Sequence, residues 1–86
     1  MNTFKLIISS PDGDAFNDQA EALFVRGVEG ELAVMAGHIP FMTSVSPCVC
    51  RVALPDGSEK SAQVDGGILT VSADSTVLLS SSFNWI

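Results

Sequence analysis

Residues 48–64, which decide the fold, read Cys-Val-Cys-Arg-Val-Ala-Leu-Pro-Asp-Gly-Ser-Glu-Lys-Ser-Ala-Gln-Val. From Cys48 to Leu54 an apolar side chain recurs at every second position, which is the pattern of one face of a strand. The turn sequence Pro-Asp-Gly-Ser follows at 55–58, where proline presets φ and glycine accepts a left-handed conformation. Since residues 59–64 supply a second strand-like segment, the stretch predicts a β-hairpin.

Alternating segments and turns extend from this hairpin in both directions. Turns recur about every eight to twelve residues, and no segment holds a 3.6-residue period. Residues 17–23 are the best helical candidate, but β-type residues follow them directly. We therefore predict an all-β fold, a flattened β-sandwich or barrel of about 8–10 mostly antiparallel strands. Outside the hairpin, strands are expected at 4–8, 20–25, 31–35, 41–45, 68–71 and 76–80.

The length of the chain, 86 residues, allows one domain. We expect the sandwich domain at residues 1–82 and a short C-terminal tail at residues 83–86. The aromatic side chains of this tail either cap the sandwich or pack on a partner. A chain this short buries only about 60–65% of the surface that its unfolded form exposes, so a partner that covers more surface would add to a marginal stability.

The charge of the chain excludes several classes of partner. Ten Asp and Glu residues against four Lys and Arg give a net charge of −6, and the cations form no stripe. Binding nucleic acid by neutralising phosphates is therefore not expected, and an anionic membrane surface would repel the chain. The apolar stretches fall short of the ~20 residues that span a bilayer, and the N-terminus alternates like a strand. We expect a soluble, cytosol-facing protein without direct membrane insertion.

The sequence offers little for catalysis. His38 is the only histidine, and none of the serines lies in a Gly-x-Ser-x-Gly turn. The glycine pair Gly66-Gly67 does not join a strand to a helix and is not followed by Gly-Lys-Ser/Thr, so it is interpreted as a bend rather than a phosphate loop. We expect no catalytic residue and no cofactor, and thus no enzyme activity of the chain alone.

The two cysteines are interpreted as small core residues. Cys48 and Cys50 lie on the same face of a strand, roughly 7 Å apart, whereas a disulfide needs Cβ atoms about 4 Å apart. A metal site would need further ligands at suitable spacing, and a single histidine is all that the chain adds. No disulfide and no metal site are expected.

The segment with the strongest functional signal runs Gly30-Glu-Leu-Ala-Val-Met-Ala-Gly-His-Ile-Pro-Phe-Met-Thr43. It predicts a short strand, a tight Gly-His loop held by Pro40, and a second strand. Such a loop presents Glu31 and His38 near one end of the sandwich. Fixed loops on a rigid β scaffold are where binding residues are usually found.

The spacing Gly-Glu-x-x-Val-x-x-Gly-His-x-Pro in this segment, followed by an apolar pair and Thr, resembles the N-terminal β-sandwich domain of the epsilon subunit of F-type ATP synthases. The resemblance also includes an opening strand and turn, a central hairpin and a closing Gly-Gly strand pair. These parts occur in order over most of residues 4–80: residues 4–13, 51–59, 64–71 and 76–79.

The resemblance implies a non-catalytic rotor subunit at the foot of the central stalk of a proton-transporting ATP synthase. Such a domain packs against the gamma subunit, rests on the membrane-embedded c-ring, and couples ring rotation to ATP synthesis. Its location would be peripheral, at the cytoplasmic face of the bacterial inner membrane. By matching family positions, Glu31 is expected to contact the c-ring, and Ser10, His38 and Thr43 are expected to contact the gamma subunit. The isolated chain is expected to be a monomer or to self-associate weakly.

The chain also departs from the family pattern. The family usually continues into two C-terminal helices that restrain ATP hydrolysis, whereas this chain ends at Ile86, so we expect a short form without that regulation. Cys48 stands where the family often has glycine, and Met35-Ala36 where proline often precedes the Gly-His pair. Both differences indicate a divergent member.

An apolar interface with the gamma subunit is expected from side chains that a broad face leaves partly exposed. The main alternative function is a stand-alone β-sandwich module that captures peptides on an edge strand. A small hydrolase built around His38 is the other rival. The candidate apolar residues are Leu23, Val25, Ile39, Phe41 and Met42.

Overall fold

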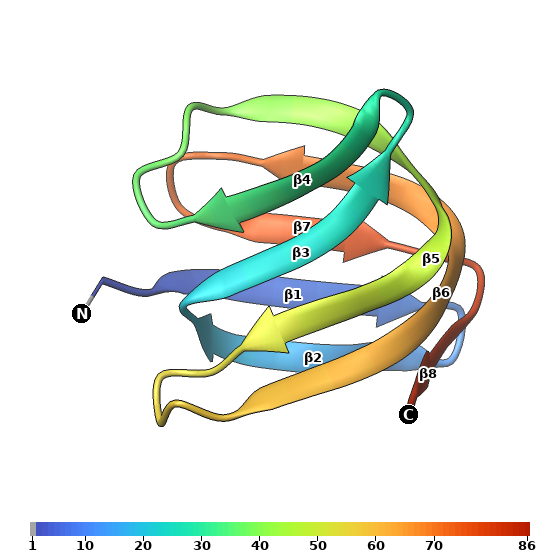
Figure 1. The fold of residues 1–86 in the computed structure, drawn as a ribbon, viewed down its shortest axis with the longest axis horizontal. Coiled ribbons are helices and arrows are strands. Elements are labelled where there is room, and N and C mark those ends of the chain that lie inside the picture. The colour runs from blue at the N-terminus through green and yellow to red at the C-terminus, as the bar shows by residue number, and fades with distance from the viewer. Residues whose placement is uncertain (1) are drawn as a thin grey trace.

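The strands of this protein form one sheet that folds back on itself, so that its inner face encloses the apolar core (Figure 1). The structure is a computed structural model that describes residues 2–86, and these residues contain no helix. The strands are β1 (Phe4–Ser10), β2 (Gly13–Ala20), β3 (Ala22–Gly27), β4 (Gly30–Met35), β5 (Phe41–Ala53), β6 (Glu59–Val71), β7 (Thr76–Leu79) and β8 (Phe83–Trp85).

The strand order along the sheet is β2-β1-β7-β6-β5-β3-β4, and β8 pairs with β6 off this path. β1 and β7 are parallel, and the other pairs are antiparallel. One edge of β6 pairs with β5. Along the other edge, the first half of β6 pairs with β8 and the second half pairs with β7. The predicted all-β fold with mostly antiparallel strands is confirmed.

Two long, bent strands replace two pairs of predicted short ones. Residues 41–45 and 48–54 were expected as separate strands, but β5 joins residues 41–45 to residues 48–53, and β6 likewise joins residues 59–64 to 68–71. β5 and β6 pair along their whole length. At the bend the buried positions of β5 change from odd to even numbers, and those of β6 change from even to odd. This change of face explains why the sequence suggests an interruption.

The bend in β6 depends on Gly66 and Gly67, because the chain passes very close to its neighbours there. A Cβ atom on Gly67 would lie 2.0 Å from the carbonyl oxygen of Leu79. Gly66 has φ +88°, and its Cβ would lie 2.9 Å from the carbonyl oxygen of Val45. The buried hydroxyl of Ser80 donates a hydrogen bond of 2.6 Å to the Gly66 carbonyl. The bend is thus a tightly packed crossing of β6 and the end of β7.

Two strands were not predicted. β2 is mostly exposed and polar and lies at one end of the sheet path, so it lacks the apolar alternation of a covered strand. β8 lies in the segment that was expected to form a tail. The Trp85 ring contacts Phe83 and Phe16, at centroid distances of 4.8 and 6.2 Å, and Lys60 Nζ lies 4.3 Å from its centroid. Although these aromatic rings pack on the sandwich, the domain boundary at residue 82 stays a prediction.

The core lies between the two halves of the folded sheet and contains side chains from nearly every strand. Cys50 belongs to this core, as expected, whereas Cys48 is only half-buried at its margin. The largest fully buried side chains are Leu6, Ile8, Leu23, Val34, Cys50, Val52, Val64, Leu69 and Leu78.

Candidate interaction surfaces

Two rows of outward-pointing side chains cross the sheet from β5 over β6 and β7 to β1. The strand registers place the members of each row side by side. Their sequence neighbours point inward and are largely buried, which fixes the outward direction of the rows. None of the row side chains carries a charge. We call this surface the outer apolar face; its first row is Met42, Thr70, Val77 and Ile7, and its second is Ser44, Ile68, Leu79 and Ser9.

The outer apolar face exposes large side chains to solvent. Met42 is 69% exposed, Leu79 51% and Ile68 42%. In a chain with net charge −6, an uncharged surface that spans four strands is unusual. Exposed apolar patches that polar residues border often mark contact sites with other proteins.

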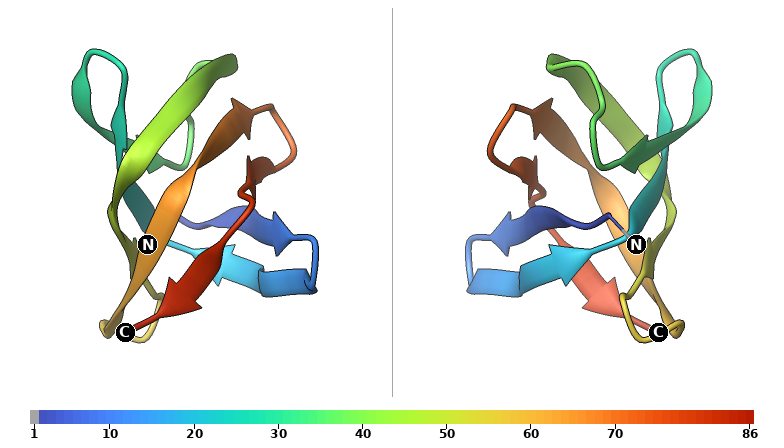
Figure 2. Two further views of the ribbon diagram at one scale, coloured as in Figure 1. Left: turned by 90° about the vertical axis from the view of Figure 1, so that its right-hand side faces the viewer. Right: turned by 90° about the vertical axis from the view of Figure 1, so that its left-hand side faces the viewer.

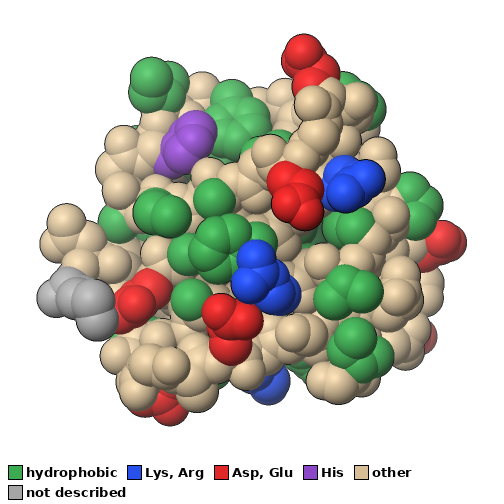
Figure 3. Space-filling model, in the orientation of Figure 1, with side chains coloured by type: hydrophobic (Ala, Val, Ile, Leu, Met, Phe, Trp, Pro, Cys, Tyr) green, Lys and Arg blue, Asp and Glu red, His purple; other side chains and the backbone are tan. Residues whose placement is uncertain are grey.

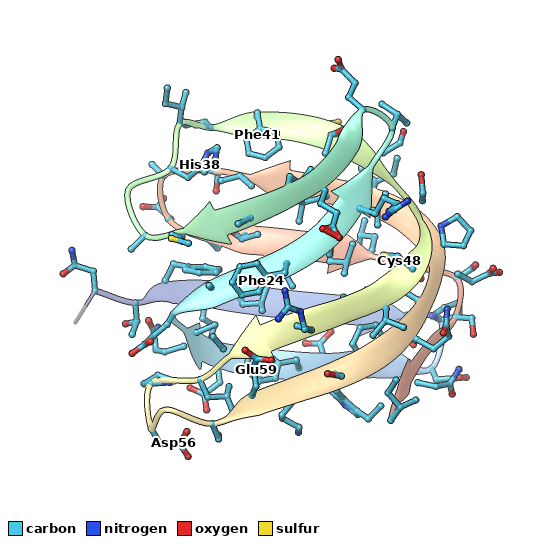
Figure 4. All side chains as sticks on the ribbon, viewed as in Figure 1. Phe24, His38, Phe41, Cys48, Asp56 and Glu59 are labelled. Carbon is cyan, nitrogen blue, oxygen red and sulfur yellow. The ribbon has the colours of Figure 1, made fainter. Side chains whose placement is uncertain are left out.

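The residues expected at an apolar interface divide into three groups by their exposure. Leu23 and Val25 are 0% and 4% exposed, so the expectation was wrong for both: they point into the core from β3. Ile39 and Met42 are exposed. Phe41 is half-buried and packs against the ring of His38, with the centroids 4.9 Å apart (Figure 4).

One end of the sandwich is open between the β3–β4 hairpin and the first residues of β5. Figure 2 shows that these two segments diverge toward this end. Glu31, Thr43 and the half-buried Leu32 line the hollow between them, which we call the mouth. The hairpin tip beside it carries the exposed Val28 and Glu29. The mouth therefore combines two carboxylates with apolar side chains.

The four residues with predicted contact roles lie in three places. Glu31 and Thr43 line the mouth together. His38 lies in the β4–β5 loop, where its backbone N–H donates to the Met35 carbonyl at 3.2 Å. Ser10 ends β1 and shares a shallow hollow with Leu79 at the margin of the outer apolar face. The assignments of these residues to particular partners stay predictions.

A further hollow is formed by β3, β4 and the second half of β5. Phe24 lies near the middle of this face, with Cys48 to its right and Glu59 below it in the view of Figure 4. Figure 3 shows adjacent acidic and basic side chains among hydrophobic ones on the same face. Arg26 and Arg51 line the hollow, and no motif in the sequence singles out either of them.

Among residues 2–86, no group of three or more His, Cys, Asp and Glu side chains is arranged to hold a metal ion. The same part of the chain has no helix that is long and apolar enough to cross a membrane. Both cysteines are free thiols. Burial, and to a lesser extent the neighbouring Cys48, raises the pKa of the Cys50 thiol from 9.0 to about 11. At neutral pH Cys50 is therefore a protonated core residue.

The raised pKa of Cys50 predicts a loss of stability in alkali. The unfolded chain releases this proton near pH 9.0 and the folded chain near pH 11, so the stabilisation is complete below about pH 9 and is lost as the pH rises toward 11. Cys50→Val should show a smaller loss of unfolding free energy than the wild type between about pH 8 and about pH 10.5, measured by urea denaturation. The half-buried Cys48→Val is the control and should keep most of the wild-type loss. Equal losses in all three proteins would contradict the prediction.

Comparison with known proteins identifies related sequences. Residues 3–86 match the family described as "ATP synthase, Delta/Epsilon chain, beta-sandwich domain". A curated relative, the "ATP synthase epsilon chain, sodium ion specific" of Acetobacterium woodii, is 36% identical over 83 residues. The match covers 96% of this chain and 62% of the relative, so the chain spans less than two thirds of the relative's length.

Solved structures share the fold. A chain of the Euglena gracilis mitochondrial ATP synthase, in the cryo-EM structure of OSCP/F1/c-ring in rotational state 1, has a TM-score of 0.91 at 20% identity, covering 96% of this chain and 53% of that one. A chain of the Tetrahymena thermophila mitochondrial ATP synthase central stalk and c-ring has a TM-score of 0.80 at 11% identity, covering 95% of this chain and 66% of that one. At these identities the likeness shows the fold alone.

Proposed function

Because the chain belongs to the ATP synthase delta/epsilon chain β-sandwich domain family, we propose that it is a non-catalytic subunit of the rotor of an F-type ATP synthase. In this role it couples rotation of the c-ring, driven by proton flow, to the gamma subunit and to ATP synthesis. The name of the Acetobacterium woodii relative supports the subunit type, and the neighbours' titles, which include a central stalk and c-rings, support the location. That relative is named sodium ion specific, and the coupling role proposed here does not depend on which ion drives the ring.

The outer apolar face is the observation that carries this proposal. A coupling subunit works through contact surfaces that hold under torque, and it needs no reaction centre. Met42, Ile68 and Leu79 supply an uncharged surface that a second protein would remove from water. We assign this face to the gamma subunit. Ser10 borders it beside Leu79, which supports Ser10 as a gamma contact. His38 packs on Phe41, whose side chain points to the side of β5 opposite Met42, so its proposed gamma contact lies beside this face and not on it.

The mouth is assigned to the c-ring. Glu29 and Glu31 give this end of the sandwich a negative charge beside the apolar Val28, which suits a ring surface formed by polar loops. Thr43 lines the same hollow as Glu31, so its proposed contact with the gamma subunit lies where the ring and gamma surfaces would meet. In this arrangement the domain is peripheral at the cytoplasmic face of the bacterial inner membrane. The isolated chain is a monomer or associates only weakly.

Reversing the charge of Glu31 tests the proposed ring contact. In a reconstituted synthase, Glu31→Lys should lower the rate of gradient-driven ATP synthesis roughly threefold or more, because a lysine would face the ring in place of a carboxylate. Binding to the cognate gamma subunit, measured by co-purification, should persist. Asp18→Lys makes the same charge change on β2, away from the mouth, and should leave synthesis unchanged.

Two outcomes would count against these assignments. If Glu31→Lys abolished gamma binding together with synthesis, Glu31 would be a structural residue and not a ring contact. If the unmodified chain formed no one-to-one complex with its cognate gamma subunit, the rotor proposal itself would fail. A peptide-binding module would then be the better reading, with β2 or β4, the two ends of the sheet path, as the capturing edge.

A further inference from the structure

The cations of this acidic chain are not evenly distributed. The chain has four Lys and Arg residues against ten Asp and Glu, and both arginines line the hollow across β3, β4 and β5. The volume of the hollow is about 540 Å³, which lies within the range of ligand-binding sites. Its lining residues come from β3, β4 and the second half of β5, and none of them belongs to the outer apolar face that we assign to the gamma subunit.

The hollow exists because the pairing between β3 and β5 is interrupted. Phe24 pairs with Arg51, and Gly27 pairs with Val45. Between these two pairs, residues 25–26 of β3 lie opposite the longer stretch 46–50 of β5. Within the described chain, residues 46–50 of β5 have no partner on β3, although β6 pairs along their other edge. Of this stretch, Pro47, Cys48 and Val49 line the hollow, whereas Cys50 is fully buried. Since alternate residues of an antiparallel strand point their main-chain groups to one edge and proline has no N–H, this edge offers the hollow only a few main-chain groups.

Both arginines are held loosely. Arg26 Nη2 lies 3.9 Å from Glu31 Oε1, and Arg51 Nη1 lies 3.7 Å from Glu59 Oε1. These distances exceed those of charge-assisted hydrogen bonds, and about half or more of each side chain is exposed. Exposed ion pairs of this kind are weak, so a carboxylate with bidentate geometry can replace the present partners.

The surroundings of Arg51 orient its side chain, and the hollow adds apolar contact. The Arg51 guanidinium carbon lies 4.7 Å from the centroid of the Phe24 ring, an arrangement that orients the planar group. Val49, which is 50% exposed, and Pro47 line the same hollow. The hollow thus combines two arginines, each beside a glutamate, with an aromatic wall and exposed apolar side chains.

We propose that this hollow binds an extended acidic segment of a partner polypeptide. Carboxylates of the segment bind Arg26 and Arg51, its apolar side chains pack on Val49 and Pro47, and its main chain runs along the open edge at residues 47–49. The open edge favours a polypeptide over a free small acid, because only a polypeptide can use main-chain groups in this way. The proposal does not depend on the rotor function.

The test is a titration of the isotope-labelled chain, followed by amide NMR shifts, with a short acetylated and amidated peptide that alternates valine with glutamate. We expect saturable shifts at Arg26, Val49 and Arg51, and binding at least about tenfold weaker for the same peptide with glutamine in place of glutamate. Added salt should weaken the binding of the glutamate peptide.

Variants separate the hollow from general charge effects. Arg26→Gln with Arg51→Gln should weaken binding at least about tenfold, whereas Lys60→Gln, which removes a cation beside Trp85, should not. Because both arginines are about half exposed, the double variant should keep a dispersed, folded spectrum, which the same experiment records. Equal binding of both peptides, or saturable binding of benzoate as tight as that of the glutamate peptide, would overturn the proposal.

Discussion

Replacing Gly67 with alanine is expected to destabilise the protein by about 3–5 kcal/mol. The new Cβ would lie 2.0 Å from the Leu79 carbonyl oxygen, a distance that no van der Waals contact allows, and the obstacle is backbone rather than a movable side chain. Relief requires β6 and β7 to separate where Ile68 pairs with Leu79. The hydrogen bond from Ser80 to Gly66 holds the same crossing. A chain of this size has a total stability of roughly 4–13 kcal/mol.

Urea denaturation measures the effect, and Gly13→Ala is the matched control. Gly13 also has a positive φ, +119°, but nothing lies within 4 Å of the position that its Cβ would take, so this variant reports backbone strain without a clash. Its expected cost is about 1–2 kcal/mol. If Gly67→Ala were no more costly than Gly13→Ala, the close approach of β6 to Leu79 would not be a constraint on the fold.

The bend at Gly66-Gly67 also shows what the sequence could predict. The sequence correctly predicted strands on either side of the glycines, and each half of β6 keeps a period of two. It could not show that the two halves are one strand. Glycine marks a turn and a bend in the same way, and only pairing with β5 across the bend distinguishes them. That pairing joins residues far apart in the sequence.

Strands at the margin of the fold were harder to predict than those in the core. β2 carries Asp14, Asp18 and other polar residues because its outer edge and much of its surface meet water, so its sequence resembles a loop. β8 has only three residues, and its position depends on the free edge of β6 beside Ala62 and Val64. Such strands form where the rest of the sheet leaves an edge, which local pattern does not encode.

The candidate surfaces were predicted only in part. The resemblance pointed to Glu31 and His38, but the outer apolar face emerges from cross-strand neighbours that alternation alone cannot identify. Ile68 and Leu79 become neighbours only through the β6–β7 register, and Leu79 and Ser9 only through the parallel pair of β7 with β1. Likewise, the hollow lined by the two arginines depends on an interrupted ladder. Surfaces composed of several strands require the strand order.

Placing a carboxylate in the outer apolar face is expected to disrupt the proposed gamma complex. Leu79 lies between Ile68 and Ser9 in the second row and is 51% exposed, so a partner that covers the face would bury it. Leu79→Glu would then bury an unpaired charge, and affinity for the cognate gamma subunit should fall at least about 100-fold, or about 2.7 kcal/mol. The free chain should lose no more than about 1 kcal/mol of stability, since half of the side chain already meets water.

Met35→Glu provides the matched control for this experiment. Met35 is a strand residue with 52% exposure, nearly the same as Leu79, but it lies on β4, away from the outer apolar face. Both variants add one negative charge to a chain that already carries a net charge of −6, so a general electrostatic effect would weaken gamma binding equally in the two. A dissociation constant that changes only for Leu79→Glu, with unfolding curves close to the wild type, would locate the contact on β7 and its neighbours. Equal changes, or none, would mean that gamma binds elsewhere on the sandwich.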